Sequence, residues 1–248
     1  CPPGGRPGDV RRRAPGFWGK CSLRPADPLF PTLQDRGEPS WKPSRARDVV
    51  AALYSNNAQR SAELLGKWIA DNPKDRVAYQ QFGRALSQLQ RPDEADAAYQ
   101  KALDLGATDA GIYLGLGQIR NQQKRYNDAA ELLTKAVEKG ARNSFVYGQL
   151  GYVQLILNRN EEAIKTFEKA FEAGIPPGAN TRGLGYYNMA CGYARLKNFD
   201  KAFEMLNKAV DEGFVTRNSY ETDTDFNVLR ADPRFEKLLA RMPKPSGD

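Results

Sequence analysis

The chain has 248 residues, 40% of them hydrophobic, a length that allows one or two domains with a buried core. It contains no histidine, which excludes Ser-His-Asp and Cys-His catalytic systems, histidine zinc sites and any imidazole general base. Its cysteines, Cys1, Cys21 and Cys191, form no Cys-x-x-Cys pair and are too scattered for a zinc or disulfide framework. No apolar run approaches the roughly 18 residues of a membrane-spanning helix. We therefore expect neither a cofactor nor a metal site.

Residues 1–43 are predicted to form a disordered arm that is rich in proline and arginine. Residues 1–47 carry a net charge of +6, which leaves +1 of the total +7 for the rest of the chain. Nine of the 16 prolines lie in this segment, which shows no helical or strand period. The cations and aromatic rings of residues 11–24 are compatible with nucleic acid or anionic lipid, but a solvated arm explains them more simply.

A pattern 34 residues long recurs along the rest of the chain, in units at 76–109, 110–143, 144–177 and 183–216. The first of these units has, at its places 4, 7, 8, 11, 20, 24 and 27, Tyr79, Phe82, Gly83, Leu86, Ala95, Tyr99 and Ala102. The last unit is shifted by a five-residue insertion around residues 175–180, and a degraded unit precedes the others at 44–73. This spacing predicts two antiparallel helices in each unit, with apolar residues on their facing sides.

Small residues and helix ends recur at fixed places in the units. Place 8 is expected to meet the alanine of place 20 where the two helix axes approach, as Gly83 would meet Ala95. The second helices are expected to begin at Pro92-Asp93, Asn127-Asp128 and Asn160-Glu161, where polar oxygens can cap free N–H groups and acids lie near the positive helix end. Glycines that tolerate left-handed dihedrals are expected to end those helices, and they are Gly106, Gly140, Gly174 and Gly213.

The recurring aromatic, glycine and alanine places resemble the tetratricopeptide repeat, and they do so well over residues 76–214 and weakly over 44–73. The usual tryptophan at place 4 is tyrosine here, and the usual proline near place 32 is kept only at Pro73. The resemblance implies an all-α, right-handed superhelix of four to five helix pairs. Residues 44–214 would form this array, and residues 217–248 the capping helices and tail.

The C-terminal segment has its own start signal and apolar stripe. Asp232 and Pro233 form a helix start, and beyond them one apolar stripe consists of Phe235, Leu238, Leu239 and Met242. We expect a closing helix that covers the final repeat, since a solenoid needs such a cover. A helix that docks a partner is the alternative.

Places 2, 5, 9 and 12 of each first helix form the stripe expected to face the groove of the superhelix. The candidate binding residues on this stripe are Gln80, Arg84, Leu114, Gln118, Asn121, Phe145, Tyr152, Leu184 and Tyr187. Their amides at one end and rings at the other suit a neutral, partly apolar peptide or helix. Alanine at Tyr152 or Tyr187 is expected to weaken binding without unfolding the chain. The alternative is that these side chains are covered between neighbouring units.

The resemblance implies a non-enzymatic adaptor for protein or peptide partners, with no small-molecule substrate. Only Arg84 carries positive charge on the stripe, so the two-carboxylate clamp of some related domains is absent. One alternative is an accessory region of a larger enzyme or envelope assembly. The other is RNA binding, against which the nearly neutral repeat array argues.

The terminal and internal cysteines have separate expectations. We expect a soluble protein of the cytoplasm or periplasm; lipid anchoring through Cys1 is a further alternative, against which the following Pro-Pro-Gly-Gly argues. Cys191 is expected to be a packing residue, since no histidine is present to activate it. The oligomeric state is left open.

Overall fold

The structure is a computed structural model that describes residue 52 and residues 57–175, 180–214 and 216–243. All described residues belong to one compact unit, Ser44–Asp248. They form eleven α-helices and one 3₁₀ helix, and the described part of the chain contains no strand. The predicted arm at 1–43 and the insertion at 176–179 lie outside the described residues. The predicted all-α class is confirmed.

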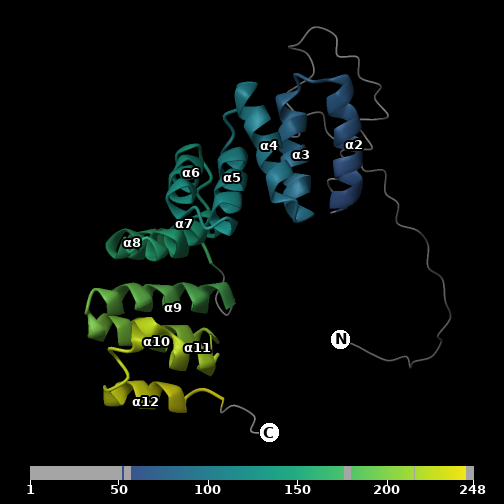
Figure 1. Ribbon diagram of the computed structural model, residues 1–248. Coiled ribbons are helices and arrows are strands. Elements are labelled where there is room, and N and C mark those ends of the chain that lie inside the picture. Colours follow the sequence, from purple (N-terminus) through teal and green to yellow (C-terminus); the bar gives the residue numbers. More distant parts are fainter. Residues whose placement is uncertain (1–51, 53–56, 176–179, 215, 244–248) are drawn as a thin grey trace, which may run out of the picture. The chain divides into compact units, whose positions relative to one another are not determined.

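The helices follow one another as antiparallel pairs (Figure 1). The pairs are α3 (Arg76–Gln88) with α4 (Pro92–Asp104), α5 (Ala110–Gln122) with α6 (Tyr126–Glu138), α7 (Ser144–Ile156) with α8 (Asn160–Glu172), and α9 (Asn180–Arg195) with α10 (Phe199–Asp211). The helix α2 (Ala58–Asp71) precedes them and packs against α3. Three first helices begin at the first residue of a predicted unit, because each unit is one helix pair.

The turns between pairs use the predicted left-handed glycines. The φ angles of Gly106, Gly140 and Gly174 are 79°, 103° and 93°, and that of Gly213 is 84°. The turn inside each pair also has a left-handed residue, which is not glycine and which the sequence did not predict. These residues are Gln90, Lys124, Asn158 and Lys197, with φ between 57° and 60°. Left-handed dihedrals thus occur both in the turn inside each helix pair and in the turn that follows the pair.

The helix caps differ from the prediction. The N-caps of α4, α6 and α8 are Arg91, Arg125 and Arg159, and no side chain caps these helices by a hydrogen bond. Side-chain caps are found on the first helices α3 and α7 and on the second helix α10, and on α3 Asp75 accepts from the N–H groups of Val77 and Ala78. Acids do occupy the first turns of α4, α6 and α8, so the favourable charge near the helix dipole remains.

The small residue at place 8 leaves room for the large side chain at place 24. A Cβ atom built on Gly83 would lie 2.9 Å from Cδ1 of Tyr99, and one on Gly151 would lie 3.0 Å from Cε1 of Phe167. The atoms nearest to a Cβ built at place 8 therefore belong to place 24, and the approach to the alanine of place 20 stays a prediction. A large side chain on the second helix fills the space that glycine leaves on the first.

The C-terminal segment repeats the register of the array. It consists of α11 (Arg217–Thr222), the 3₁₀ helix η1 (Thr224–Phe226) and α12 (Pro233–Ala240). Arg217 lies 34 residues after Gly183, so α11 begins at place 1 and α12 at place 17, where α4, α6, α8 and α10 also begin. The segment is a shortened repeat, a relation that the sequence analysis missed.

The shortened repeat closes the core as the sequence predicts. Asp232 caps α12 by accepting from the N–H of Arg234 at 2.9 Å, and Pro233 occupies the first turn. The predicted stripe is buried at Phe235, Leu238 and Met242, and Leu239 packs beside them. The stripe packs into the last core cluster and is used within the chain, so the interpretation as a closing helix is confirmed.

Candidate functional site

The first helices of successive units contact one another, α3 with α5, α5 with α7 and α7 with α9. Each second helix contacts the first helix that follows it, as α4 contacts α5 and α6 contacts α7. The first helices thus form a continuous layer. We call places 2, 5, 9 and 12 of α3, α5, α7 and α9 the first-helix face.

Large apolar side chains are exposed at one end of the first-helix face. Phe145 is 55% exposed, Tyr152 46% and Leu184 42%, and these are three of the six exposed large hydrophobic residues in the described part of the chain. Phe145 and Tyr152 are seven residues apart on α7, which places them on one side of the helix two turns apart. Leu184 lies on the adjacent α9. We call these three residues the apolar patch.

Gly148 lies between the two rings of the patch on α7. A Cβ atom built on Gly148 would have no neighbouring atom within 4 Å, whereas one on Gly151, a turn further along, would crowd Phe167. Gly148 therefore faces open space, and no packing inside the chain requires glycine there. The space over Gly148, between Phe145 and Tyr152, is therefore open, and we call this open space the hollow.

The other end of the first-helix face is polar. Gln80, Gln118 and Asn121 are half-buried, and their side-chain amides form no hydrogen bond with another described residue. Arg84 is exposed and forms no ion pair within the described ranges. Leu114 is half-buried and packs against the core of the middle units, so it contributes less surface than predicted for a groove residue. The amides and Arg84 are available to a ligand.

Tyr187 is the predicted groove residue that the structure places elsewhere. It is only 7% exposed, and its ring centroid lies 5.0 Å from that of Phe214 and 5.2 Å from those of Tyr220 and Phe226. Its hydroxyl donates to Oδ2 of Asp223 at 2.7 Å. The expectation that Tyr187 lines an open groove is therefore corrected, because the shortened repeat covers it.

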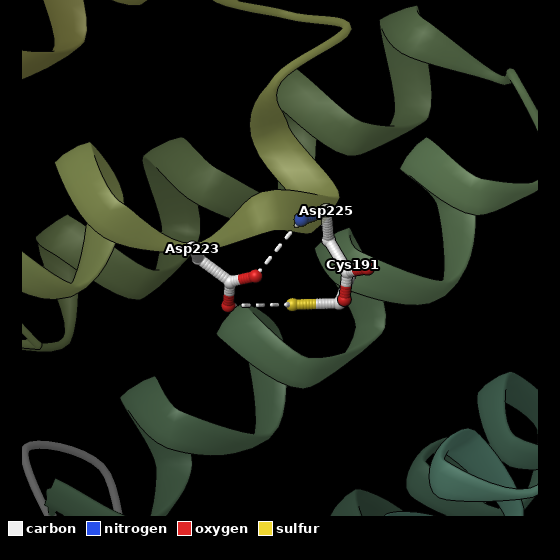
Figure 2. A group of neighbouring side chains, drawn as sticks. All are labelled: Cys191, Asp223 and Asp225. Carbon is white, nitrogen blue, oxygen red and sulfur yellow. Dashed lines mark hydrogen bonds between the residues drawn. The ribbon is translucent and has the colours of Figure 1, made fainter.

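Figure 2 shows that Cys191 of α9 points toward two carboxylates of the shortened repeat. The thiol Sγ lies 3.8 Å from Oδ2 of Asp223, whose Oδ1 accepts from the N–H of Asp225 at 2.9 Å. Arg195 donates through Nε to Oδ1 of Asp225 at 2.8 Å and through a terminal nitrogen to the carbonyl of Leu155 at 2.5 Å. This network ties the shortened repeat to α9 and α7.

The same network contains three side chains of the kinds that ligate metals. The ligand atoms of Cys191, Asp223 and Asp225 lie within 4.8 Å of one another, a spacing that suits a cation. The carboxylates already accept from the hydroxyl of Tyr187, the Asp225 N–H and Arg195. Burial, and then the charge of Asp223, raise the pKa of the Cys191 thiol, which favours its protonated form. The donor set fits a structural contact better than a metal, and the buried thiol agrees with the predicted packing role.

Charge divides the two layers of helices. The helices α3, α5, α7 and α9 contain no aspartate or glutamate, whereas acids are numerous in α4, α6, α8 and α10. Three arginines of the first helices pair with acids at 2.7–2.8 Å, namely Arg120 with Asp96, Arg182 with Glu212, and Arg195 with Asp225. Arg84 keeps its charge facing solvent.

None of the helices in the described ranges has the length and apolar character that a membrane span requires.

Comparison with known families identifies the repeats. Tetratricopeptide repeat family matches cover residues 81–144 and, for a second family description, residues 146–173 and 185–212. These ranges overlap all four helix pairs from α3 to α10. The chain belongs to the tetratricopeptide repeat family. No curated protein sequence matches it significantly.

Solved structures with the same fold include YrrB, described as a TPR protein with an unusual peptide-binding site. YrrB is 21% identical, with a TM-score of 0.61, and the match covers 73% of this chain and 91% of YrrB. MamA is 19% identical, with a TM-score of 0.58, over 66% of this chain and 93% of MamA. At this identity the likeness concerns the fold, which is a tetratricopeptide solenoid.

Proposed function

We propose that this chain is a non-enzymatic scaffold that binds a neutral, partly apolar peptide or helix on its first-helix face. The observation that carries the proposal is the apolar patch of Phe145, Tyr152 and Leu184 on adjacent first helices. Aromatic and aliphatic side chains that gather at the surface of a folded chain mark interaction sites. The solved relative YrrB, described as having a peptide-binding site, supports this kind of ligand.

The size of the patch suits a modest affinity. Covering a side chain such as Phe or Leu completely contributes about 1.5–3 kcal/mol, and these residues are already about half covered. Ordering the partner and losing its translational freedom oppose binding by several kcal/mol. We therefore expect a transient complex, unless the amides of Gln80, Gln118 and Asn121 add hydrogen bonds.

The absence of enzymatic activity is also part of the proposal. The sequence has no histidine, and burial raises the pKa of Cys191, the one thiol in the described residues, away from that of a reactive nucleophile. Side chains with unpaired polar groups, such as Gln118 and Asn121, are suited to hydrogen bonding with a ligand and not to proton transfer near neutral pH.

The test is selection of a displayed library of random peptides on the full-length chain. Selected peptides are then measured on Phe145→Ser/Tyr152→Ser, where affinity should fall by about tenfold or more, or about 1.4 kcal/mol. The matched control is Leu196→Ser/Val228→Ser, which removes two exposed hydrophobic residues of 37% and 54% exposure outside the patch. Equal binding by both double variants, or no selected peptide at all, would contradict the proposal.

Single-stranded RNA forms the second arm of the same experiment. We expect no binding near physiological ionic strength, because three of the five first-helix arginines are paired with acids. RNA binding that falls steeply with salt and is unchanged in Phe145→Ser/Tyr152→Ser would favour RNA as the ligand instead.

A further inference from the structure

The open space over Gly148 lies between two exposed aromatic residues of α7. Phe145 and Tyr152 are separated by about 10.5 Å along α7, at 1.5 Å per residue. Gly148 lies between them with no atom close to its missing Cβ, so the floor is backbone and the two ends are aromatic. One bulky apolar side chain fits over such a floor. Contact with the two neighbouring aromatic residues would reduce the exposure of this side chain to water.

The polar end of the face favours an extended ligand over a helix. A helix satisfies its own backbone groups, so only the ends of its backbone need partners. An extended segment keeps unpaired N–H and C=O groups along its length. The amides of Gln80, Gln118 and Asn121 supply both donors and acceptors, and no described residue pairs with them.

The charge of the first-helix face restricts the charge that the ligand can carry. No acid lies on α3, α5, α7 or α9, so nothing on the first helices attracts a lysine or arginine of a ligand. Arg84 is exposed and has no acidic partner in the described part of the chain. A carboxylate of the ligand would compensate this charge, and a cation would be repelled.

The spacing of the two features follows from the repeat. Arg84 and Tyr152 both occupy place 9, on α3 and α7, with α5 between these helices. Two steps of about 8–10 Å between axes separate them by about 16–20 Å. An extended chain covers this distance in about five or six residues at 3.3 Å each.

We propose that the ligand is an extended segment that places one bulky apolar side chain over Gly148 and a carboxylate opposite Arg84, about five or six residues away. This inference rests on the proposed function, keeps a partly apolar peptide as the ligand, and replaces its neutral charge by a single carboxylate. The ligand is uncharged between these two anchors. Its backbone runs past Asn121 and Gln118.

The experiment selects the random peptide library on the parent and on two variants, and compares the sequences recovered. On the parent, the peptides should pair an apolar residue with an acid at the stated spacing, with lysine and arginine depleted. Arg84→Glu should exchange the acid for lysine or arginine, since the charge opposite is reversed. Lys101→Glu, which makes the same charge change on the exposed side of α4, should leave the recovered sequences unchanged.

Gly148→Leu tests the hollow in the same selection. The added side chain should fill the space over Gly148 and weaken the parent's peptides by about tenfold. Thermal unfolding must show that the variant is folded, and Gly148→Ala, which adds only one methyl group in open space, provides a second and milder variant. Gly66→Ala on α2, where the new Cβ would also be only loosely contacted, is the control outside the face.

The outcomes separate the two proposals. Peptides that depend on Phe145 and Tyr152 but show no acid, and ignore Arg84→Glu and Gly148→Leu, would overturn this inference and leave the proposed function standing. Peptides that bind without depending on Phe145 and Tyr152, or a library that yields none, would overturn both. Exchange of the acid in Arg84→Glu, together with loss of affinity in Gly148→Leu, would support both.

Discussion

The helices α7 and α9 occupy the same position in successive units, yet the same places are open on one helix and closed on the other. At place 5, Gly148 of α7 faces open space, whereas Tyr187 of α9 is buried. At place 9, Tyr152 is 46% exposed and Cys191 only 4%. The place of a residue in the repeat therefore does not decide its exposure. The element stacked next to it does.

The shortened repeat explains this difference. Regular first helices such as α7 have 13 residues, but α11 ends after six, at Thr222. Asp223 then accepts from the N–H of Asp225 and from the hydroxyl of Tyr187, and η1 brings Phe226 over α9. A full-length first helix would continue straight past this point. The early break lets the chain fold over the end of the first-helix face and limits the open surface to α3–α7 and the start of α9.

The largest expected effect distinguishes the two tyrosines of this comparison. Tyr187→Ala should lower the free energy of unfolding by about 3–5 kcal/mol, the range for removing a large buried aromatic side chain. Tyr152→Ala should change it by no more than about 0.5 kcal/mol, because its ring is half exposed. Urea denaturation followed by circular dichroism measures both. Similar losses in the two variants would show that the α7 surface is not open.

A glycine of α9 provides the second test. A Cβ atom on Gly183 would lie 2.7 Å from Cβ of Phe214 and 3.1 Å from the carbonyl oxygen of Ala209. Since backbone cannot move aside easily, Gly183→Ala should destabilise the chain by about 1–3 kcal/mol despite alanine's better helix propensity. Hydrogen exchange in α10 and α12 should accelerate. Unchanged exchange there would mean that α10 and Phe214 are packed less closely on α9 than the structure indicates.

The pH dependence of stability tests the buried thiol. Burial and the charge of Asp223 raise the pKa of Cys191 above the value of about 8.5 expected in the unfolded chain. Above that pH the unfolded chain loses the proton and the folded chain keeps it, so stability falls by up to about 1.4 kcal/mol per pH unit. Cys191→Ala should show a smaller fall in the urea midpoint between about pH 8 and 10. Identical slopes for parent and variant would contradict a buried, protonated thiol.

The smallest expected effect has the opposite sign and lies on α7. Gly148→Ala should stabilise the chain by about 0.5–1 kcal/mol, since alanine is favoured in a helix and its methyl group meets no atom within 4 Å. The midpoint of thermal unfolding should rise. A lower midpoint would show that something covers Gly148, and the hollow proposed for the ligand would then be occupied by the chain itself.

Much of the fold was predictable, because in a repeat the same residue types recur at the same spacing several times. The starts of α3, α5 and α7 and the left-handed glycines, such as Gly106, follow from the 34-residue spacing. The left-handed Lys124 and the absent side-chain caps at Arg91 were not predicted. Lysine and arginine are not residue types that favour turns, so a sequence pattern gives no reason to expect them there. The chain nevertheless turns at these positions. The shortened repeat was also missed, although Tyr220 stands at place 4, because its apolar places after that residue are lost.

The candidate site, like the fold, was predictable only in part. The exposure of Phe145, Tyr152 and Leu184 agrees with their helical places, because the period of a helix fixes which side a residue faces. The burial of Tyr187 could not be read from its place, since the covering groups lie 27–39 residues further along the chain.

By itself, the sequence determined the all-α class, the helix pairs and the faces of each helix, since these depend on local spacing and on contacts between adjacent units. Only the tertiary structure decided where the open surface ends. That boundary depends on an early helix break at Asp223 and on the hydrogen bonds that hold η1 against Tyr187 and Cys191. No periodic pattern in the sequence predicts which residues form such contacts.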